Sequence, residues 1–143
     1  MKTIIALRGK GNSGKSETIR ILHNLLDNND YELVRTNLEN NTGDFVSIFR
    51  KNKIFIGITS SGDLYDYVHD RLEELINDGC KICVCACRSY DRVPPGTNAA
   101  VTEFPGYTPQ FVEKTYDDSE NTQEETNQND ANILFEVIHS LLQ

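Results

Sequence analysis

The sequence predicts an α/β protein, a three-layer α/β/α sandwich whose helices cover both faces of a five-stranded, mainly parallel sheet. Strand-like and helix-like segments alternate along the chain of 143 residues, which is typical of this class. The runs at 54–58 and 82–87 are apolar on both faces, as strands at the centre of a parallel sheet are. A glycine-rich turn also joins the first expected strand to the first expected helix.

The N-terminal part begins with an apolar strand at 3–7. A helix is expected at 17–28, and its apolar stripe consists of Ile19, Leu22, Leu25 and Leu26. A second strand follows at 31–36. Its two faces mix polar and apolar side chains, so we expect it at an edge of the sheet.

The middle of the chain is expected to start with a polar loop at 37–43 and a short helix at 44–51. This helix is predicted from apolar residues at helical spacing, namely Phe45, Ile48 and Phe49. A third strand is expected at 53–59, followed at once by an amphipathic helix at 63–77 that ends before a glycine.

The C-terminal part is expected to hold a central strand at 82–87 and a brief helix at 97–103. A fifth strand is expected at 110–116. Residues 117–130 are acidic and rich in Asn, Gln and Thr, which predicts a mobile loop. The apolar spacing at 131–142 predicts a closing helix.

The turn after the first strand matches the phosphate-binding pattern G-x-x-x-x-G-K-[ST], known as Walker A, at every fixed position. Glycines allow a tight turn in which several backbone N–H groups face one anion. The lysine reaches the terminal phosphates, and the last hydroxyl binds Mg²⁺. The predicted nucleotide-binding residues are Gly9, Lys10, Gly11, Asn12, Ser13, Gly14, Lys15 and Ser16.

With this loop between a strand and a helix, the segment 3–28 resembles the P-loop NTPase superfamily. The resemblance implies a P-loop fold, with strand order 2-3-1-4-5 in the numbering of the five expected strands. It also implies a nucleoside triphosphate and Mg²⁺ as cofactors. The guanine-selective N-K-x-D motif is absent from the sequence, so ATP is the expected nucleotide.

Two charged residues near strand ends complete the predicted catalytic set of Lys15, Asp63 and Arg88. Asp63, together with Ser16, is the candidate ligand of Mg²⁺; the alternative is an acid that only stabilises the start of a helix. Arg88 ends the fourth expected strand, where small P-loop kinases carry arginines on a lid, and we expect it to neutralise phosphoryl charge. Its alternative role is a surface salt bridge, for example with Asp91.

These residues predict an ATP-using enzyme that transfers a phosphoryl group, as a kinase does, or hydrolyses ATP. In the first case the acceptor is an unidentified small molecule, and in the second a protein partner is coupled to hydrolysis. The alternative is a regulatory module with little turnover, in which nucleotide binding orders a loop that a partner recognises.

The charge pattern narrows the expected partners. The formal net charge is −8, but residues 115–143 hold seven acids and no Lys or Arg, which leaves 15 acids against 14 bases elsewhere. No basic stripe for nucleic acid and no apolar run of 18 residues for a membrane is present in the sequence. We therefore expect one cytoplasmic domain, residues 1–143, without nucleic-acid or membrane partners.

Four cysteines, Cys80, Cys83, Cys85 and Cys87, cluster around the fourth expected strand. Alternate cysteines on one strand spread over about 13 Å, too far for one tetrahedral metal ion. We expect them to act as small buried apolar residues. The alternative is redox sensing by Cys80 and Cys83.

Overall fold

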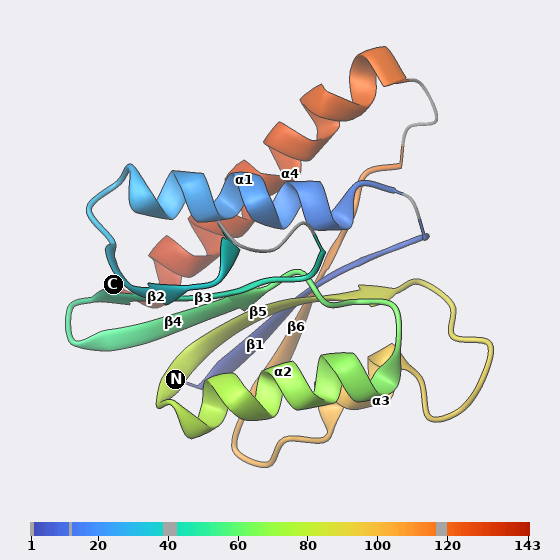
Figure 1. The fold of residues 1–143 in the computed structure, drawn as a ribbon, viewed down its shortest axis with the longest axis horizontal. Helices are drawn as coiled ribbons and strands as arrows, with labels where there is room; N and C mark the ends of the chain where they lie inside the picture. Colours follow the sequence, from blue (N-terminus) through green and yellow to red (C-terminus); the bar gives the residue numbers. More distant parts are fainter. Residues whose placement is uncertain (1, 12, 39–42, 117–119) are drawn as a thin grey trace.

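The computed structural model describes residues 2–11, 13–38, 43–116 and 120–143 as a mixed α/β fold (Figure 1). The described strands are β1 (Thr3–Gly9), β2 (Glu32–Thr36), β3 (Val46–Lys51), β4 (Ile54–Thr59), β5 (Cys80–Arg88) and β6 (Thr108–Glu113). The described helices are α1 (Lys15–Asp27), α2 (Tyr65–Asn77), α3 (Thr97–Thr102) and α4 (Glu120–Leu141). None of these helices combines the length and the apolarity needed to cross a lipid bilayer.

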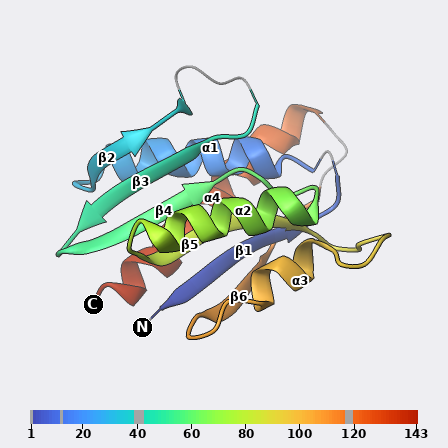
Figure 2. The same ribbon diagram turned by 60° about the horizontal axis from the view of Figure 1, so that its bottom comes forward.

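Helices cover both faces of the sheet, as predicted. Helices α1 and α4 lie on one face, and α2 and α3 lie on the other (Figures 1 and 2). The sheet therefore has a core on each side, because successive side chains of a strand point in opposite directions. In β1, Ile5 and Leu7 join the core under α1 and α4, whereas Ile4 and Ala6 join the core under α2 and α3.

The prediction of a helix at 44–51 is wrong, because this segment forms β3. Val46 and Ile48 enter one core while Phe49 enters the other, which is the alternation of a strand. The turn to β4 has positive φ at both central residues, Asn52 (53°) and Lys53 (67°). This backbone matches the twist of a two-residue β-hairpin and pairs β3 with β4 antiparallel.

The predicted five strands and their order 2-3-1-4-5 are also wrong, since the sheet has six described strands in the order β2-β3-β4-β5-β1-β6. The expected order placed β1 between β4 and β5, but β5 lies between β4 and β1. The pairs β1–β5, β1–β6 and β4–β5 are parallel, and β2–β3 and β3–β4 are antiparallel. The sheet is therefore mixed, with β2 at an edge as predicted.

The predicted acidic loop at 117–130 is helical from Glu120 onward, as the first half of α4. Residues 117–119 lie outside the described part of the chain. Buried contacts explain the helix: Asn127 and Asp130 point inward from this polar segment and are bound by other elements. The last strand, β6, also begins and ends earlier than the predicted 110–116.

The expectation that the cysteines are small buried residues is confirmed for all four. Cys83, Cys85 and Cys87 share one face of β5, and an irregularity in the β4–β5 pairing brings Cys80 into the same core. Burial raises the pKa of Cys80 and of Cys87 to about 12, and it also raises the pKa of Cys83 and Cys85. The reactive thiolate is thus disfavoured, which argues against redox sensing.

Candidate functional site

The loop between β1 and α1 lies at the carboxyl end of the central strands. Gly14 precedes α1 with φ of 93°, a left-handed conformation that glycine adopts without strain. Gly9 ends β1 beside Lys114, where an added Cβ would lie 2.7 Å from the lysine Cβ. Gly14 is therefore required by its backbone conformation, and Gly9 is required by the close approach of Lys114. Asn12 lies outside the described residues.

Lys15 points back over this loop. Its Nζ donates hydrogen bonds to the carbonyl oxygens of Gly9 at 2.7 Å and Lys10 at 2.9 Å, and the residue is only 6% exposed. Burial lowers the pKa of the Lys15 ammonium, the charge of Asp63 opposes this shift, and the charge of Arg88 adds to it. A positive charge is thus held in the loop by neutral carbonyl groups.

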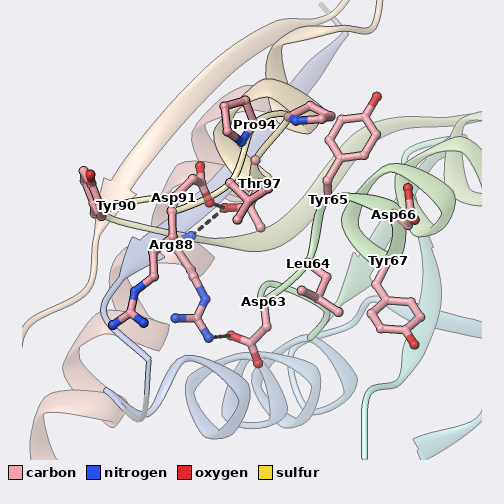
Figure 3. A pocket seen from close by; sticks show the side chains of 14 residues that line it. Asp63, Leu64, Tyr65, Asp66, Tyr67, Arg88, Tyr90, Asp91, Pro94 and Thr97 are labelled. Atoms are coloured by element: carbon pink, nitrogen blue, oxygen red, sulfur yellow. Dashed lines mark hydrogen bonds and ion pairs between the residues drawn. The ribbon is translucent and has the colours of Figure 1, made fainter.

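Arg88 and Asp63 meet beside the loop, although 24 residues separate them in the chain order. Arg88 Nη2 lies 3.4 Å from Asp63 Oδ1 (Figure 3). The same guanidinium covers the loop, because a Cβ on Gly11 would lie 3.3 Å from Arg88 Nη1. The structure therefore brings together three predicted residues, Lys15, Asp63 and Arg88. A surface salt bridge, the alternative role of Arg88, is therefore formed, and its partner is Asp63.

Asp63 reaches this position because the chain, after leaving β4, passes close to Ala86 near the end of β5. The backbone N–H of Ala86 donates to the carbonyl oxygen of Ser61 at 3.2 Å, and an added Cβ on Gly62 would lie 2.5 Å from the Cβ of Ala86. Glycine is thus needed for the close crossing. Leu64 is the residue that caps α2 and Asp66 is the acid in its first turn, so Asp63 takes neither of the two positions of its alternative role and lies just before the helix.

Asp44 is a carboxylate that the sequence offers as a group to orient an acceptor near the end of the second expected strand, and the structure places it at the end of β4 instead. It accepts hydrogen bonds from the hydroxyls of Ser60 and Ser61, each at 3.3 Å, and both serines are buried. Asp44 therefore fixes the segment that leads to Asp63. The pair of serines at the end of β4, Ser60 and Ser61, is the feature of the sequence from which a polar partner could have been inferred. Glu39, which follows the second expected strand and is a weaker candidate ligand of Mg²⁺ from the sequence, lies outside the described residues.

Buried polar side chains connect the loop to helix α4. Thr18 Oγ1 donates to Gly14 O at 2.7 Å and lies 3.2 Å from Asn127 Oδ1 on α4. Lys114 Nζ lies 3.0 Å from Asp130 Oδ2, and these two side chains are only 0% and 2% exposed. The backbone N–H and the hydroxyl of Thr115 also donate to Asp130. Helix α4 is therefore attached to both ends of the loop.

A cavity of about 710 Å³ opens on the other side of Arg88 (Figure 3). It lies between the start of α2 and the segment that joins β5 to α3. Its lining consists of Asp63, Leu64, Tyr65, Asp66, Tyr67, Arg88, Tyr90, Asp91, Arg92, Val93, Pro94, Pro95, Gly96 and Thr97. The phosphate loop and this cavity thus share the Arg88–Asp63 pair.

The residues of the site fit a magnesium ion held by a nucleotide. The hydroxyl-bearing Ser16 is exposed in the first turn of α1, and the carboxylate of Asp63 is exposed beside the loop. Mg²⁺ commonly takes one or two protein ligands and completes its shell with phosphate and water oxygens. In the described part of the chain, no group of three or more His, Cys, Asp or Glu side chains is arranged to hold a metal ion.

The chain matches no model of a protein family, no curated protein and no solved structure. Functional inference therefore depends on the geometry of this site. Membership of the P-loop NTPases stays a prediction from the motif at 9–16 and its position between a strand and a helix.

Proposed function

We propose that residues 9–16 bind the phosphates of ATP with Mg²⁺, in a fold of the P-loop NTPase type. The observation that carries the proposal is the buried Lys15 ammonium, whose described hydrogen-bond partners are two loop carbonyls. Buried charges in proteins are normally paired with an opposite charge. A phosphate bound at the start of α1 would supply that charge and would also meet the positive end of the helix dipole.

The pKa of Lys15 supports this proposal in energetic terms. Burial lowers the pKa of its ammonium in the folded protein. A basic group with a lowered pKa reduces stability at every pH below its ordinary value of 10.5, because the folded state disfavours the charged form. At neutral pH the free protein therefore carries an unfavourable contribution at this site, and an anion relieves it.

The other residues suit phosphoryl chemistry. Bound ATP would supply a transferable γ-phosphoryl group, and Mg²⁺ would neutralise part of its charge. Arg88 covers the loop at Gly11, where its guanidinium would stabilise charge on that group. Ser16 and Asp63 would hold the ion, and Asp63 would then exchange its contact with Arg88 for one with the metal.

Transfer to an acceptor is favoured over simple hydrolysis by the cavity beside Arg88, which offers a second molecule access to the same arginine. The test is the release of ADP from ATP with and without added acceptors. A kinase releases ADP only with its acceptor, and a hydrolase does so alone. Steady hydrolysis by the protein alone would favour the hydrolase.

A regulatory module with little turnover is the second candidate, and one contact favours it. Gly14 of the loop lies against Asn127 of α4, where an added Cβ would be 2.4 Å from Asn127 Oδ1. A change in the loop on nucleotide binding would therefore reach α4, whose exposed face a partner would contact. Turnover far above the uncatalysed rate would argue against this candidate.

Ser16→Ala is expected to weaken ATP binding in the presence of Mg²⁺ by about tenfold and to leave binding in EDTA nearly unchanged. The reason is that the hydroxyl contacts the metal and not the phosphates directly. Isothermal titration with and without Mg²⁺ measures both affinities. Ser16→Thr restores the hydroxyl, and Ser140→Ala, at an exposed serine of α4, is the matched control. Equal loss of affinity with and without Mg²⁺ would contradict the assignment.

A further inference from the structure

We infer that the cavity beside Arg88 binds the phosphoryl acceptor, and that this acceptor is a neutral molecule with a flat aromatic ring and a free hydroxyl group. The inference rests on the proposed function, because it takes residues 9–16 as the donor site. The cavity adjoins the donor site, has an aromatic lining and carries no surplus of positive charge.

The position of the cavity suits a second substrate. Arg88 and Asp63 form part of its wall, and the Arg88 guanidinium also covers Gly11 of the phosphate loop. Figure 3 shows Asp63 and Arg88 facing each other between the start of α2 and the segment after β5. The volume of about 710 Å³ lies within the range of about 300–1,000 Å³ that is typical of small-molecule sites.

The lining offers aromatic and apolar surface that the described protein leaves exposed. Tyr90 is 76% exposed and Val93 is 74% exposed, and Leu64 and Tyr67 are also exposed. Tyr65 forms a fixed part of the wall, because its hydroxyl donates to Glu103. Several exposed apolar side chains around one hollow are typical of a ligand site. Aromatic rings of this kind stack on flat ligands.

Charge around the cavity argues against an anionic ligand. Three acids and two arginines line it. Asp63 pairs with Arg88, and Asp91 accepts hydrogen bonds from Thr97 and Asn98. The acids of the lining therefore outnumber its arginines by three to two, so it has no surplus of positive charge for a phosphate or carboxylate. A neutral ligand suits this balance, and its hydroxyl would face the Arg88–Asp63 side.

The transfer step balances with ATP as donor. A hydroxyl oxygen of the bound acceptor forms a bond to the γ-phosphorus, and the bond from that phosphorus to the β–γ bridging oxygen breaks. ADP leaves with the electron pair of the broken bond. The hydroxyl proton passes to water at the mouth of the cavity.

Binding is tested by NMR on the full-length ¹⁵N-labelled protein, with a non-hydrolysable ATP analogue and Mg²⁺ present. The probes are guanosine, thymidine and pyridoxine, which share an aromatic ring and a hydroxyl group, and their monophosphates. We expect at least one neutral probe to shift the amides of 64–67 and 90–97 saturably, and more tightly than its monophosphate. The inference is overturned if no neutral probe does so, or if the monophosphates bind more tightly.

Two surface variants test whether the neutral probe binds in the cavity. Tyr90→Ala and Val93→Ser are expected to weaken binding of the best neutral probe at least about fivefold, because each removes exposed contact surface and neither is buried. Ile133→Ser, a change at an exposed apolar residue of α4 far from the cavity lining, is the control and is expected to change nothing. Unchanged affinity in both cavity variants would overturn the inference.

The ATP analogue alone separates the two proposals. If it binds and no neutral probe does, the acceptor site is wrong and the proposed function stands. If the analogue itself does not bind, the proposed function fails, whatever the probes do.

Discussion

Lys15→Ala is expected to lower the affinity for MgATP by about 10- to 150-fold. A hydrogen bond to a charged group contributes about 1.5–3 kcal/mol, which corresponds to this range. The fold is expected to tolerate the change, because the carbonyls that Lys15 contacts have other donors. Ser89 N donates to Gly9 O, and Ser13 Oγ donates to Lys10 O. Isothermal titration with MgATP measures the affinity, and urea unfolding without nucleotide checks the fold.

Lys81→Ala is the matched control for this change. Lys81 is exposed near the start of β5, at the opposite end of the strand from Arg88 and the loop. The Lys81→Ala change removes one positive charge, as Lys15→Ala does, but at a position away from the site. Comparing the two variants therefore separates the loss of a specific contact from the effect of net charge. If Lys15→Ala and Lys81→Ala bind MgATP as the unchanged protein does, the role of Lys15 is disproved.

Asp130→Asn is expected to reduce the free energy of unfolding by about 3–5 kcal/mol. The change leaves the Lys114 ammonium buried without a negative partner, since Asp130 is its ion-pair partner and both side chains are almost completely buried. It also alters the acceptors of Thr115, which donates twice to this carboxylate. Urea unfolding of both proteins at neutral pH measures the difference.

The double variant Lys114→Met/Asp130→Asn tests whether the unpaired Lys114 charge causes the loss of stability. Removing both charges leaves no uncompensated ion in the interior, so part of the lost stability is expected to return. Asp70→Asn, on the exposed side of α2, is the control for the loss of a carboxylate and is expected to change stability by less than about 0.5 kcal/mol. A double variant less stable than Asp130→Asn would contradict the ion-pair account.

The core of the candidate site was predictable because its signal is local. The pattern from Gly9 to Ser16 fixes a strand, a tight turn and a helix within one short stretch, and the structure has these elements. The approach of Asp63 and Arg88 to the loop follows from a general property of parallel strands, whose carboxyl ends lie at the same edge. Local chemistry and one rule of sheet architecture were therefore sufficient for these residues.

The errors arose where pairing between distant segments decides the structure. The segment at 44–51 has apolar residues at helical spacing, but its pairing with β2 and β4 makes it a strand. The order of the sheet depends on the register of β1 with β5, from Thr3 opposite Ile82 to Gly9 opposite Arg88. No local pattern encodes that register, since both strands are apolar on both faces.

Helix α4 shows that the composition of a segment does not always predict its secondary structure. The polar sequence at 120–130 is typical of a loop, and only its buried partners reveal why it is helical. Asp130 meets Lys114 after β6, and Asn127 meets Thr18 and Gly14 at the phosphate loop. Tertiary contacts thus override weak local preference. The same contacts connect α4 to the phosphate site, a connection that the predicted loop did not suggest.

The central claim, that residues 9–16 bind a magnesium nucleotide, is tested most directly by titrating a non-hydrolysable ATP analogue with Mg²⁺ into the ¹⁵N-labelled protein. We predict saturable shifts of backbone amides at the start of α1 and at Gly9, Gly11 and Arg88, and we predict that Lys15→Ala needs about 10- to 150-fold more analogue to reach the same shifts. The absence of saturable binding of both ATP and GTP analogues to the folded protein would contradict it.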